Sequence, residues 1–383
     1  MDTTLFIVSL VVITALVFDF TNGFHDSANA MATSVATGAL KPKVAVLIAA
    51  VLNVAGAFLS TEVAKTISGG IVDDAKVTPL MVFAGLVGAI VWNLLTWLLG
   101  MPSSSSHALF GGLIGAVLIG AGASGVHFGT VISKILLPAV VAPVVAGIAA
   151  ALATFLAYKI AAQRADKRAE AGFRHGQTVS ASLVALAHGT SDGQKTMGVI
   201  TLVLITAGYQ ASGSGPQFWV ILTAGLAIGL GTYSGGWRIM RTMGKGIVDI
   251  QSPQGFAAET SSAAAILASS HLGFGLSTTQ VTSGSIIGTG IGRKLAEVRW
   301  TVARKMAYAW LLTLPAAALV GAAAAFVADK GTWGLIVVVL ALAAAIFTIW
   351  KFSRRNPVDA SNVNDHHEVS VNASDTARTP ASV

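Results

Sequence analysis

The chain has 383 residues, of which 54% are hydrophobic and only 11% are charged, and its mean hydropathy is +0.73. One soluble core could not bury this much apolar surface, so the composition predicts a polytopic membrane protein and excludes an ordinary soluble domain. The net charge of +7 is explained by basic cytoplasmic loops, and no nucleic-acid partner is expected. The absence of cysteine excludes thiol catalysis, disulfides and Cys-based metal sites.

The first predicted span, at about residues 4–30, is interrupted near its end by the polar sequence GFHDSANAMAT, residues 23–33. Asp26 lies inside this interruption. An intramembrane carboxylate is costly unless it is paired, so Asp26 is a candidate functional residue and a break in the span is expected nearby. The further segments of the first half are expected at about 44–61, 80–100, 102–120 and 132–160, of which 102–120 begins with the Ser-rich sequence PSSSSH.

A basic linker over residues 163–176 separates two halves of similar sequence, and its Lys and Arg residues predict a cytoplasmic location. The second half repeats the polar interruption as HGTSDGQKTMG, residues 188–198, where Asp192 takes the place of Asp26. VAKTISGGIVD likewise resembles IMRTMGKGIVD, and SSSH-ALF-GG-LIG resembles STTQ-VTS-GS-IIG. Three motifs that recur in the same order at similar offsets indicate an internal duplication.

The charges of corresponding loops predict that the two halves have opposite orientations in the membrane. The loop after the first Ser-rich motif, GASGVHFGT, is nearly uncharged, whereas the loop after its second copy contains Arg293, Lys294, Arg299, Arg304 and Lys305. Corresponding loops on opposite sides of a membrane require an inverted repeat with an odd number of crossings in each half. Five crossings fit if the Ser-rich segment crosses.

We therefore predict an all-α polytopic membrane protein with two inverted-topology repeats, broken helices at the Ser/Thr-rich motifs and about 11–12 membrane segments. Its parts are expected at 1–162 (first inverted repeat), 163–176 (basic cytoplasmic linker), 177–328 (second inverted repeat), 329–355 (an additional C-terminal transmembrane helix) and 356–383 (tail). The tail has no apolar pattern, so we expect it to be disordered.

The paired motifs resemble the signatures of the inorganic phosphate transporter (Pit) family in its bacterial branch, which is related to the type III sodium/phosphate cotransporters. GFHDSANAMAT and HGTSDGQKTMG, together with PSSSSH and STTQ, carry this resemblance, which spans roughly residues 5–328. It implies a secondary active symporter with inverted repeats, which imports inorganic phosphate with a coupling cation. It also implies a multi-pass protein of the plasma membrane, the bacterial inner membrane, and it suggests a homodimer.

The residues themselves also point to an oxyanion site. Backbone N–H groups at a helix N-terminus direct a partial positive charge at an anion, and nearby hydroxyls add donors. Two Ser/Thr clusters, residues 103–106 and 277–279, precede apolar segments, and half-helices from opposite sides would meet near the midplane. Helix capping by hydroxyls would explain one such cluster, but two clusters related by the repeat favour a site.

The two acids fit phosphate once its protons are counted. Phosphate keeps one or two P–OH protons near neutral pH, and the ionised carboxylates of Asp26 and Asp192 can accept hydrogen bonds from them. Sulfate has no proton to donate, so it would meet unpaired negative charge. Lys195, three residues after Asp192, could offset one negative charge. The predicted phosphate-binding residues are Asp26, Ser104, Ser105, Ser106, Asp192, Gln194, Lys195, Ser277, Thr278 and Thr279.

The residue before each acid bears on the coupling cation. The resemblance implies Asn at both positions in sodium-coupled relatives, whereas this chain has His25 and Ser191. Imidazole is a poor Na⁺ ligand and titrates near neutral pH, which favours a proton. The alternatives are a sodium-coupled symporter, a purely orienting role of His25, and a divalent metal–phosphate complex as the carried species. The residues expected to serve coupling are His25, Asp26, Asn29, Ser191 and Asp192.

Three further polar residues, His107, His188 and Gln280, are expected to brace or gate the site. Glu259 is another embedded acid that could bind a cation, but its first-half counterpart by spacing lies near Gly85, so the repeat does not support this role. We expect no catalytic residue, no cofactor and no metal site.

Two other functional classes compete with a transporter. An intramembrane hydrolase is conceivable because Ser, His and Asp occur together, but no nucleophile elbow of the GxSxG type is present. Inverted symmetry serves alternating access and offers nothing to hydrolysis. An anion channel is the other alternative, since it would use the same cage of donors.

Overall fold

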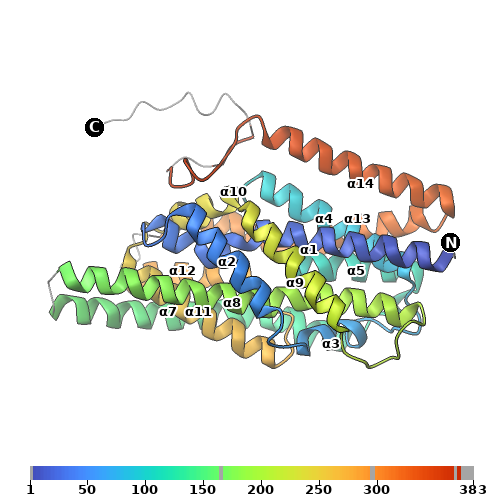
Figure 1. Cartoon of the computed structure of the whole chain (residues 1–383), viewed down its shortest axis with the longest axis horizontal. Coiled ribbons are helices and arrows are strands. Elements are labelled where there is room, and N and C mark those ends of the chain that lie inside the picture. The colour runs from blue at the N-terminus through green and yellow to red at the C-terminus, as the bar shows by residue number, and fades with distance from the viewer. Residues whose placement is uncertain (1–2, 164–166, 294–297, 366–368, 372–383) are drawn as a thin grey trace.

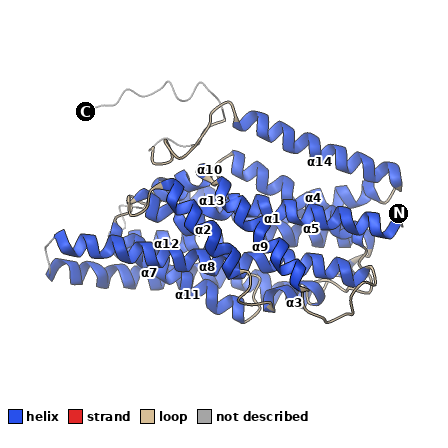
Figure 2. Cartoon of the chain, in the orientation of Figure 1, coloured by secondary structure: helices blue, strands red, loops and turns tan. Residues whose placement is uncertain are grey.

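The computed structural model describes residues 3–163, 167–293, 298–365 and 369–371. Within these ranges every named element is a helix (Figure 2), as expected where backbone groups must be satisfied inside one segment. The longer helices are α1 (Thr3–Ala36), α2 (Pro42–Gly56), α3 (Glu62–Gly69), α4 (Pro79–Leu98), α5 (Ser105–Gly120), α7 (Leu137–Gln163), α8 (Lys167–Thr206), α9 (Phe218–Ser234), α11 (Ser252–His271), α12 (Thr278–Arg293), α13 (Trp300–Ala328) and α14 (Thr332–Ser353). The short ones are η1 (Ala123–Gly125), α6 (Phe128–Val131), η2 (Ile132–Leu136), α10 (Trp237–Arg241) and η3 (Thr242–Gly246).

Fewer helices have the length and composition of a membrane span than the sequence led us to expect. Five qualify among the described residues, namely Thr4–Ala36, Pro79–Leu98, Phe128–Lys159, Trp300–Ala328 and Thr332–Ser353. The pair Phe218–Ser234 and Trp237–Gly246, which is bent by 61°, makes a sixth if it is one span. The other helices fall outside this test because α2 and α5 are short, and because α8, α11 and α12 contain many polar residues, so the count of 11–12 segments stays a prediction.

The polar interruptions do not break the helices that contain them. Residues 23–33 lie within α1 and residues 188–198 lie within α8, and both helices are continuous there. The expected break in the first span is therefore wrong, because the polar side chains bond to neighbouring helices and leave the backbone ladder intact. The chain breaks instead before the two Ser/Thr clusters, between α4 and α5 and between α11 and α12.

The two halves of the chain intertwine around a central pair of helices, α1 and α8 (Figure 1). α1 packs against α9 from the second half, and α8 packs against α2 from the first. α5 packs against α13 in the same way that α12 packs against α7. α14 lies at the edge of the bundle, where it contacts α13 and α4. Each half thus supplies helices to the surroundings of the other.

Corresponding loops of the two halves also form corresponding backbone contacts. Val72 and Val126 form an isolated antiparallel bridge, and so do Val248 and Val298. Beside them, the N–H of His127 donates to the carbonyl of Ile71 at 2.9 Å, as the N–H of Arg299 donates to that of Ile247 at 2.8 Å. These contacts pair residues that the motif offsets make equivalent.

The polar motifs lie between two apolar cores. One core contains the first part of α1 and the last part of α8, with α4 and α5; the other contains the last part of α1, α2 and the middle of α8, with residues from α11 and α12. Asp26 and Asp192 therefore occupy a narrow polar layer with apolar packing on both sides. In such a layer water is excluded and charges interact strongly.

A buried arginine fastens the start of the C-terminal segment to the bundle. Arg238 is 2% exposed and donates to the carbonyls of Leu98 at 2.8 Å and Ser353 at 3.0 Å. It also donates to the carbonyl of Asn356 at 2.5 Å. Residues 356–365 of the tail form turns against this end of the molecule, while residues 366–368 and 372–383, which we also expected to be disordered, lie outside the described residues.

Candidate functional site

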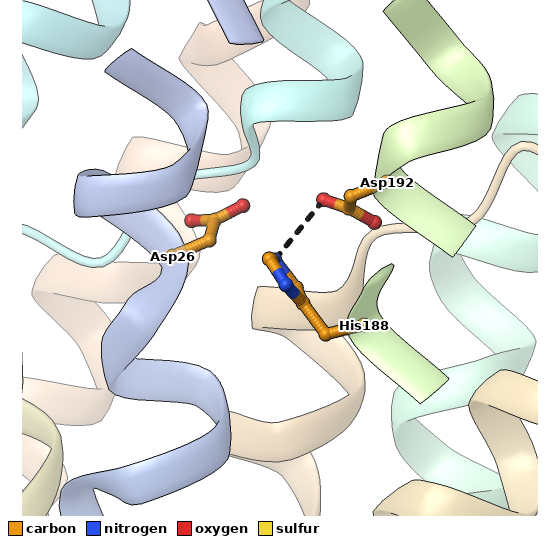
Figure 3. A group of neighbouring side chains, drawn as sticks. All are labelled: Asp26, His188 and Asp192. Carbon is orange, nitrogen blue, oxygen red and sulfur yellow. Dashed lines mark ion pairs between the residues drawn. The ribbon is translucent and has the colours of Figure 1, made fainter. Parts of the chain in front are cut away.

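Asp26 on α1 and Asp192 on α8 face one another at the centre of the molecule, with His188 of α8 between them (Figure 3). The ligand atoms of these three side chains all lie within 4.8 Å of one another, and Nε2 of His188 is 3.6 Å from Oδ2 of Asp192. All three residues are at most 1% exposed. Two carboxylates and an imidazole at this spacing can share a proton or hold a cation.

Asp26 accepts hydrogen bonds from both halves of the chain. Ser105 at the start of α5 donates its hydroxyl to Oδ2 at 2.5 Å, and Thr279 at the start of α12 donates to Oδ1 at 3.1 Å. Nδ1 of His25 lies 2.6 Å from Oδ1. Nε2 of the same imidazole lies 3.2 Å from the hydroxyl of Thr96 on α4. The predicted neighbours His25, Ser105 and Thr279 therefore all reach the Asp26 carboxylate.

Asp192 has a different set of partners. Nζ of Lys195 lies 2.5 Å from Oδ1, and this ion pair is fully buried. The hydroxyl of Thr278 donates to Oδ2 at 3.3 Å. The carboxylate that repeats Asp26 is thus neutralised by an ammonium group from its own helix, one turn away.

The two hydroxyl clusters meet beside these acids because both follow a break and open a helix. The side chain of Ser104 accepts a hydrogen bond from the N–H of His107 at 3.1 Å, and that of Ser277 accepts one from the N–H of Gln280 at 3.2 Å. Such N-caps are local and readable from sequence. The hydroxyl of Ser106 donates to the carbonyl of Leu276 at 3.1 Å, which joins the two clusters directly.

Several predicted residues have partners away from the acids. The side-chain carbonyl of Gln194 accepts from the N–H of Val63 at 2.8 Å, so it caps α3. Nδ1 of His188 lies 3.1 Å from Oδ1 of Asn53. Nε2 of Gln280 lies 3.5 Å from Nδ1 of His107, and the bracing role of this pair stays a prediction.

Some buried polar atoms of the site lack a partner among the described residues. They include Oδ1 of Asn29, the hydroxyl of Ser191 and Nε2 of His107. Most buried polar groups in proteins are hydrogen-bonded, so unpaired ones beside charged groups indicate places that a ligand or water can fill. The site therefore offers both donors and acceptors to a small polar ligand.

The sequence profile of the phosphate transporter family matches residues 22–321. The chain belongs to the phosphate transporter family. A probable low-affinity inorganic phosphate transporter of Mycobacterium tuberculosis is 54% identical over 384 residues, which cover 97% of this chain and 90% of that protein. A protein of the same description from Bacillus subtilis is 41% identical over 329 residues, which cover 85% of this chain and 98% of that protein.

The fold agrees with this assignment. A solved structure described as the sodium-dependent phosphate transporter matches with a TM-score of 0.77 and 25% identity, over 85% of this chain and all of that chain. As a member of the phosphate transporter family, the protein is a multi-pass membrane transporter and not an enzyme. The resemblance carried by the polar motifs is confirmed.

Two buried acids of this transporter were not predicted as site residues. Asp19 on α1 is fully buried near Asp192 and Lys195, and the side chains of Thr196 and Asn22 lie beside its carboxylate. Its place within an apolar run and next to the Asp26 motif was the signal that could have marked it.

The second acid, Glu259 on α11, is surrounded by donors. Thr33 and Ser34 of α1 donate to Oε1 at 2.5 Å and 2.7 Å. Ser180 of α8 donates to Oε2 at 2.5 Å, and Gln177 of α8 donates to Oε1 at 3.2 Å. The Glu259 side chain thus ties α11 to both central helices, and only the tertiary structure reveals these partners.

Proposed function

We propose that the protein is a secondary active symporter that imports inorganic phosphate across the plasma membrane, the inner membrane of a bacterium. The observation that carries this proposal is the convergence of Ser105 and Thr279, from opposite halves, on the Asp26 carboxylate. The relatives described as probable low-affinity inorganic phosphate transporters support the same substrate.

The donors and acceptors suit a partly protonated oxyanion. Hydroxyls from residues 103–106 and 277–279, with the N-termini of α5 and α12, can donate to unprotonated phosphate oxygens. The carboxylates of Asp26 and Asp192 can accept from P–OH groups. Hydrogen bonds to ionised groups are roughly twice as strong as bonds between neutral groups. An anion without a proton cannot form them and meets two unpaired carboxylates instead, so its binding is disfavoured. The sequence-based preference for phosphate over sulfate rests on this pairing.

For the coupling cation we propose a proton, with sodium as the alternative. Nδ1 of His25 lies 2.6 Å from Asp26, so a protonated ring can neutralise that carboxylate when phosphate brings further negative charge. His188 and Asp192 lie beside this pair, and Asp19 and Lys195 lie near Asp192. The matching solved structure is described as sodium-dependent, which favours the alternative. A metal–phosphate complex as cargo belongs to the same proposal.

Alternating access by two inverted repeats is the mechanism we infer. The equivalent helix pairs, α5 with α13 and α12 with α7, support it, as do the equivalent bridges at Val72 and Val248. Inverted halves can exchange conformations around a site held at their interface. The homodimer suggested by the family resemblance belongs to this proposal as well.

The deciding experiment is uptake of labelled phosphate by proteoliposomes under separately imposed proton and sodium gradients. The wild type is expected to accumulate phosphate against its gradient when protons flow inward. Asp26→Asn and Asp192→Asn should each abolish this uptake, because each removes a carboxylate acceptor. Normal coupled uptake by both variants would refute the proposed site, and a requirement for Na⁺ without any effect of pH would refute proton coupling.

Two further measurements separate the competing classes. Counterflow of labelled phosphate is expected from a carrier, whereas a channel gives only downhill flux. Hydrolysis of a phosphoester by the purified protein would revive the hydrolase, and we expect none.

A further inference from the structure

Among the differences between the two halves of the site, one pair of equivalent positions changes the fixed charge. Asn29 stands three residues after Asp26 on α1, and Lys195 stands three residues after Asp192 on α8. A spacing of three places each side chain on the same helix face as its acid. An uncharged amide in the first half thus corresponds to a cation in the second.

The hydroxyl partners of these two residues are equivalent as well. Nδ2 of Asn29 donates to the hydroxyl of Thr279, the second residue of α12, at 3.0 Å. Nζ of Lys195 donates to the hydroxyl of Ser106, the second residue of α5. Asn29 therefore reaches from α1 to the start of α12, and Lys195 reaches from α8 to the start of α5. Each side chain contacts a helix of the other half, so the two occupy corresponding places in the two repeats.

What differs is the chemistry next to the carboxylate. Nζ of Lys195 lies 2.5 Å from Oδ1 of Asp192, and both side chains are 0% exposed. In the first half, Oδ1 of Asn29 has no hydrogen-bond partner among the described residues. An amide oxygen beside a carboxylate is an environment that a hard cation or a hydronium ion prefers. The second half has an ammonium group where the first half has this unfilled acceptor.

A covalently attached ammonium neutralises Asp192 permanently. A buried carboxylate without a counter-charge is strongly disfavoured, so any transporter of this design needs a cation at each acid when the site closes. Lys195 cannot leave, so its ammonium group stays beside Oδ1 of Asp192 throughout the transport cycle. Among the described residues, the ion-pair partner of Asp26 is the imidazole of His25, with His188 within 4.8 Å, and no lysine or arginine forms an ion pair with it.

We propose that Lys195 is a tethered cation that replaces a mobile coupling ion in the second half, so that only the Asp26 half exchanges a cation during transport. The inference rests on the proposed function of the same site. Lys195 then determines how many positive charges cross the membrane with each phosphate. It also contacts Ser106 of the hydroxyl cluster at residues 103–106.

The test is Lys195→Asn, which gives both halves the same amide. Wild type and variant are reconstituted at full length, and the charge moved per phosphate is obtained from the reversal potential in vesicles. We expect the variant to move one more positive charge per phosphate and to depend more steeply on the concentration of a small cation, with Na⁺ and Li⁺ as the probes at fixed pH. An active variant with the wild-type charge ratio and cation dependence would overturn the proposal.

Two other substitutions separate charge from structure. Lys195→Arg keeps a fixed cation, so it should keep the wild-type charge ratio even if the rate falls. Lys195→Met offers neither charge nor oxygen, so we expect a loss of uptake of more than about tenfold that Na⁺ and Li⁺ do not restore. Restoration of Lys195→Met by these ions to the level of Lys195→Asn would also contradict the proposal.

A further measurement covers the case that Lys195→Asn does not fold. Phosphate binding to detergent-solubilised Lys195→Ala is measured with and without ethylammonium, which can take the place of the missing ammonium group. Recovery of binding by this amine supports the proposal, and binding that is indifferent to the truncation overturns it. If the wild type takes up no phosphate in the reconstituted vesicles, the proposed function fails. If the wild type takes up phosphate and the Lys195 variants have the same charge ratio and cation dependence as the wild type, the proposed function stands and the role of Lys195 alone fails.

Discussion

The hydroxyl of Ser105 lies 2.5 Å from Oδ2 of Asp26, and this bond joins the start of α5 to the middle of α1 across 79 residues of sequence. It connects the donor cluster of the site with the acid that the sequence marked first. We expect Ser105→Ala to lower phosphate uptake ten- to a hundredfold, since a hydrogen bond to a charged group contributes about 1.5–3 kcal/mol. Initial uptake rates in proteoliposomes measure this effect.

The matched control for that variant is Ser133→Ala. Ser133 is exposed, and its hydroxyl donates to the carbonyl of Gly129 four residues earlier. We expect unaltered uptake. Equal losses in both variants would mean that the Ser105 effect is not specific to the site.

His25 should determine whether a proton gradient drives uptake. His25→Asn replaces the imidazole 2.6 Å from the Asp26 carboxylate by an amide that cannot carry a proton, so acceleration by an inward proton gradient should fall about tenfold or more. His175→Asn, at an exposed position on α8, should respond like the wild type. Retention of the full proton effect in His25→Asn would assign the imidazole to orienting Asp26.

Asp19 and Asp26 should respond in opposite ways to replacement by Asn. Asp19 is fully buried and forms no ion pair within 4.0 Å among the described residues, so Asp19→Asn removes a costly buried carboxyl and should raise stability by up to about 2 kcal/mol. Asp26→Asn weakens the hydrogen bonds from Ser105 and Thr279, so it should lower the stability of the protein. Thermal unfolding in detergent measures both. A loss in Asp19→Asn as large as that in Asp26→Asn would show that Asp19 is a paired structural acid.

Gly236 allows the bent segment between α9 and α10 to touch α1. A Cβ atom there would lie 1.9 Å from the carbonyl oxygen of Phe24 and 2.7 Å from the hydroxyl of Ser27. Because backbone cannot move aside without repacking, Gly236→Ala should lower stability by about 1–3 kcal/mol or more. Thermal unfolding should show no such loss for Gly172→Ala, where nothing lies within 4 Å and helix propensity favours Ala by up to about 1 kcal/mol.

The sequence by itself determined the class of protein and the family, and it predicted the residues of the site. Composition dictates a membrane protein because no soluble core can bury so much apolar surface. The paired acids and hydroxyl clusters were recognisable because local rules govern them: a carboxylate in an apolar run needs a partner, and Ser104 and Ser277 cap helices within three residues of their own positions.

The tertiary structure alone decided which of these groups meet. Thr279 reaches Asp26 across 253 residues and Asn29 reaches Thr279 across 250, distances over which no sequence period carries information. The continuity of α1 through its polar motif, the turning of Gln194 towards α3 and the donors around Glu259 all follow from how helices cross. Many arrangements of long-range contacts satisfy the same local preferences, and packing between helices selects one of them. That arrangement is therefore fixed only when the bundle is assembled.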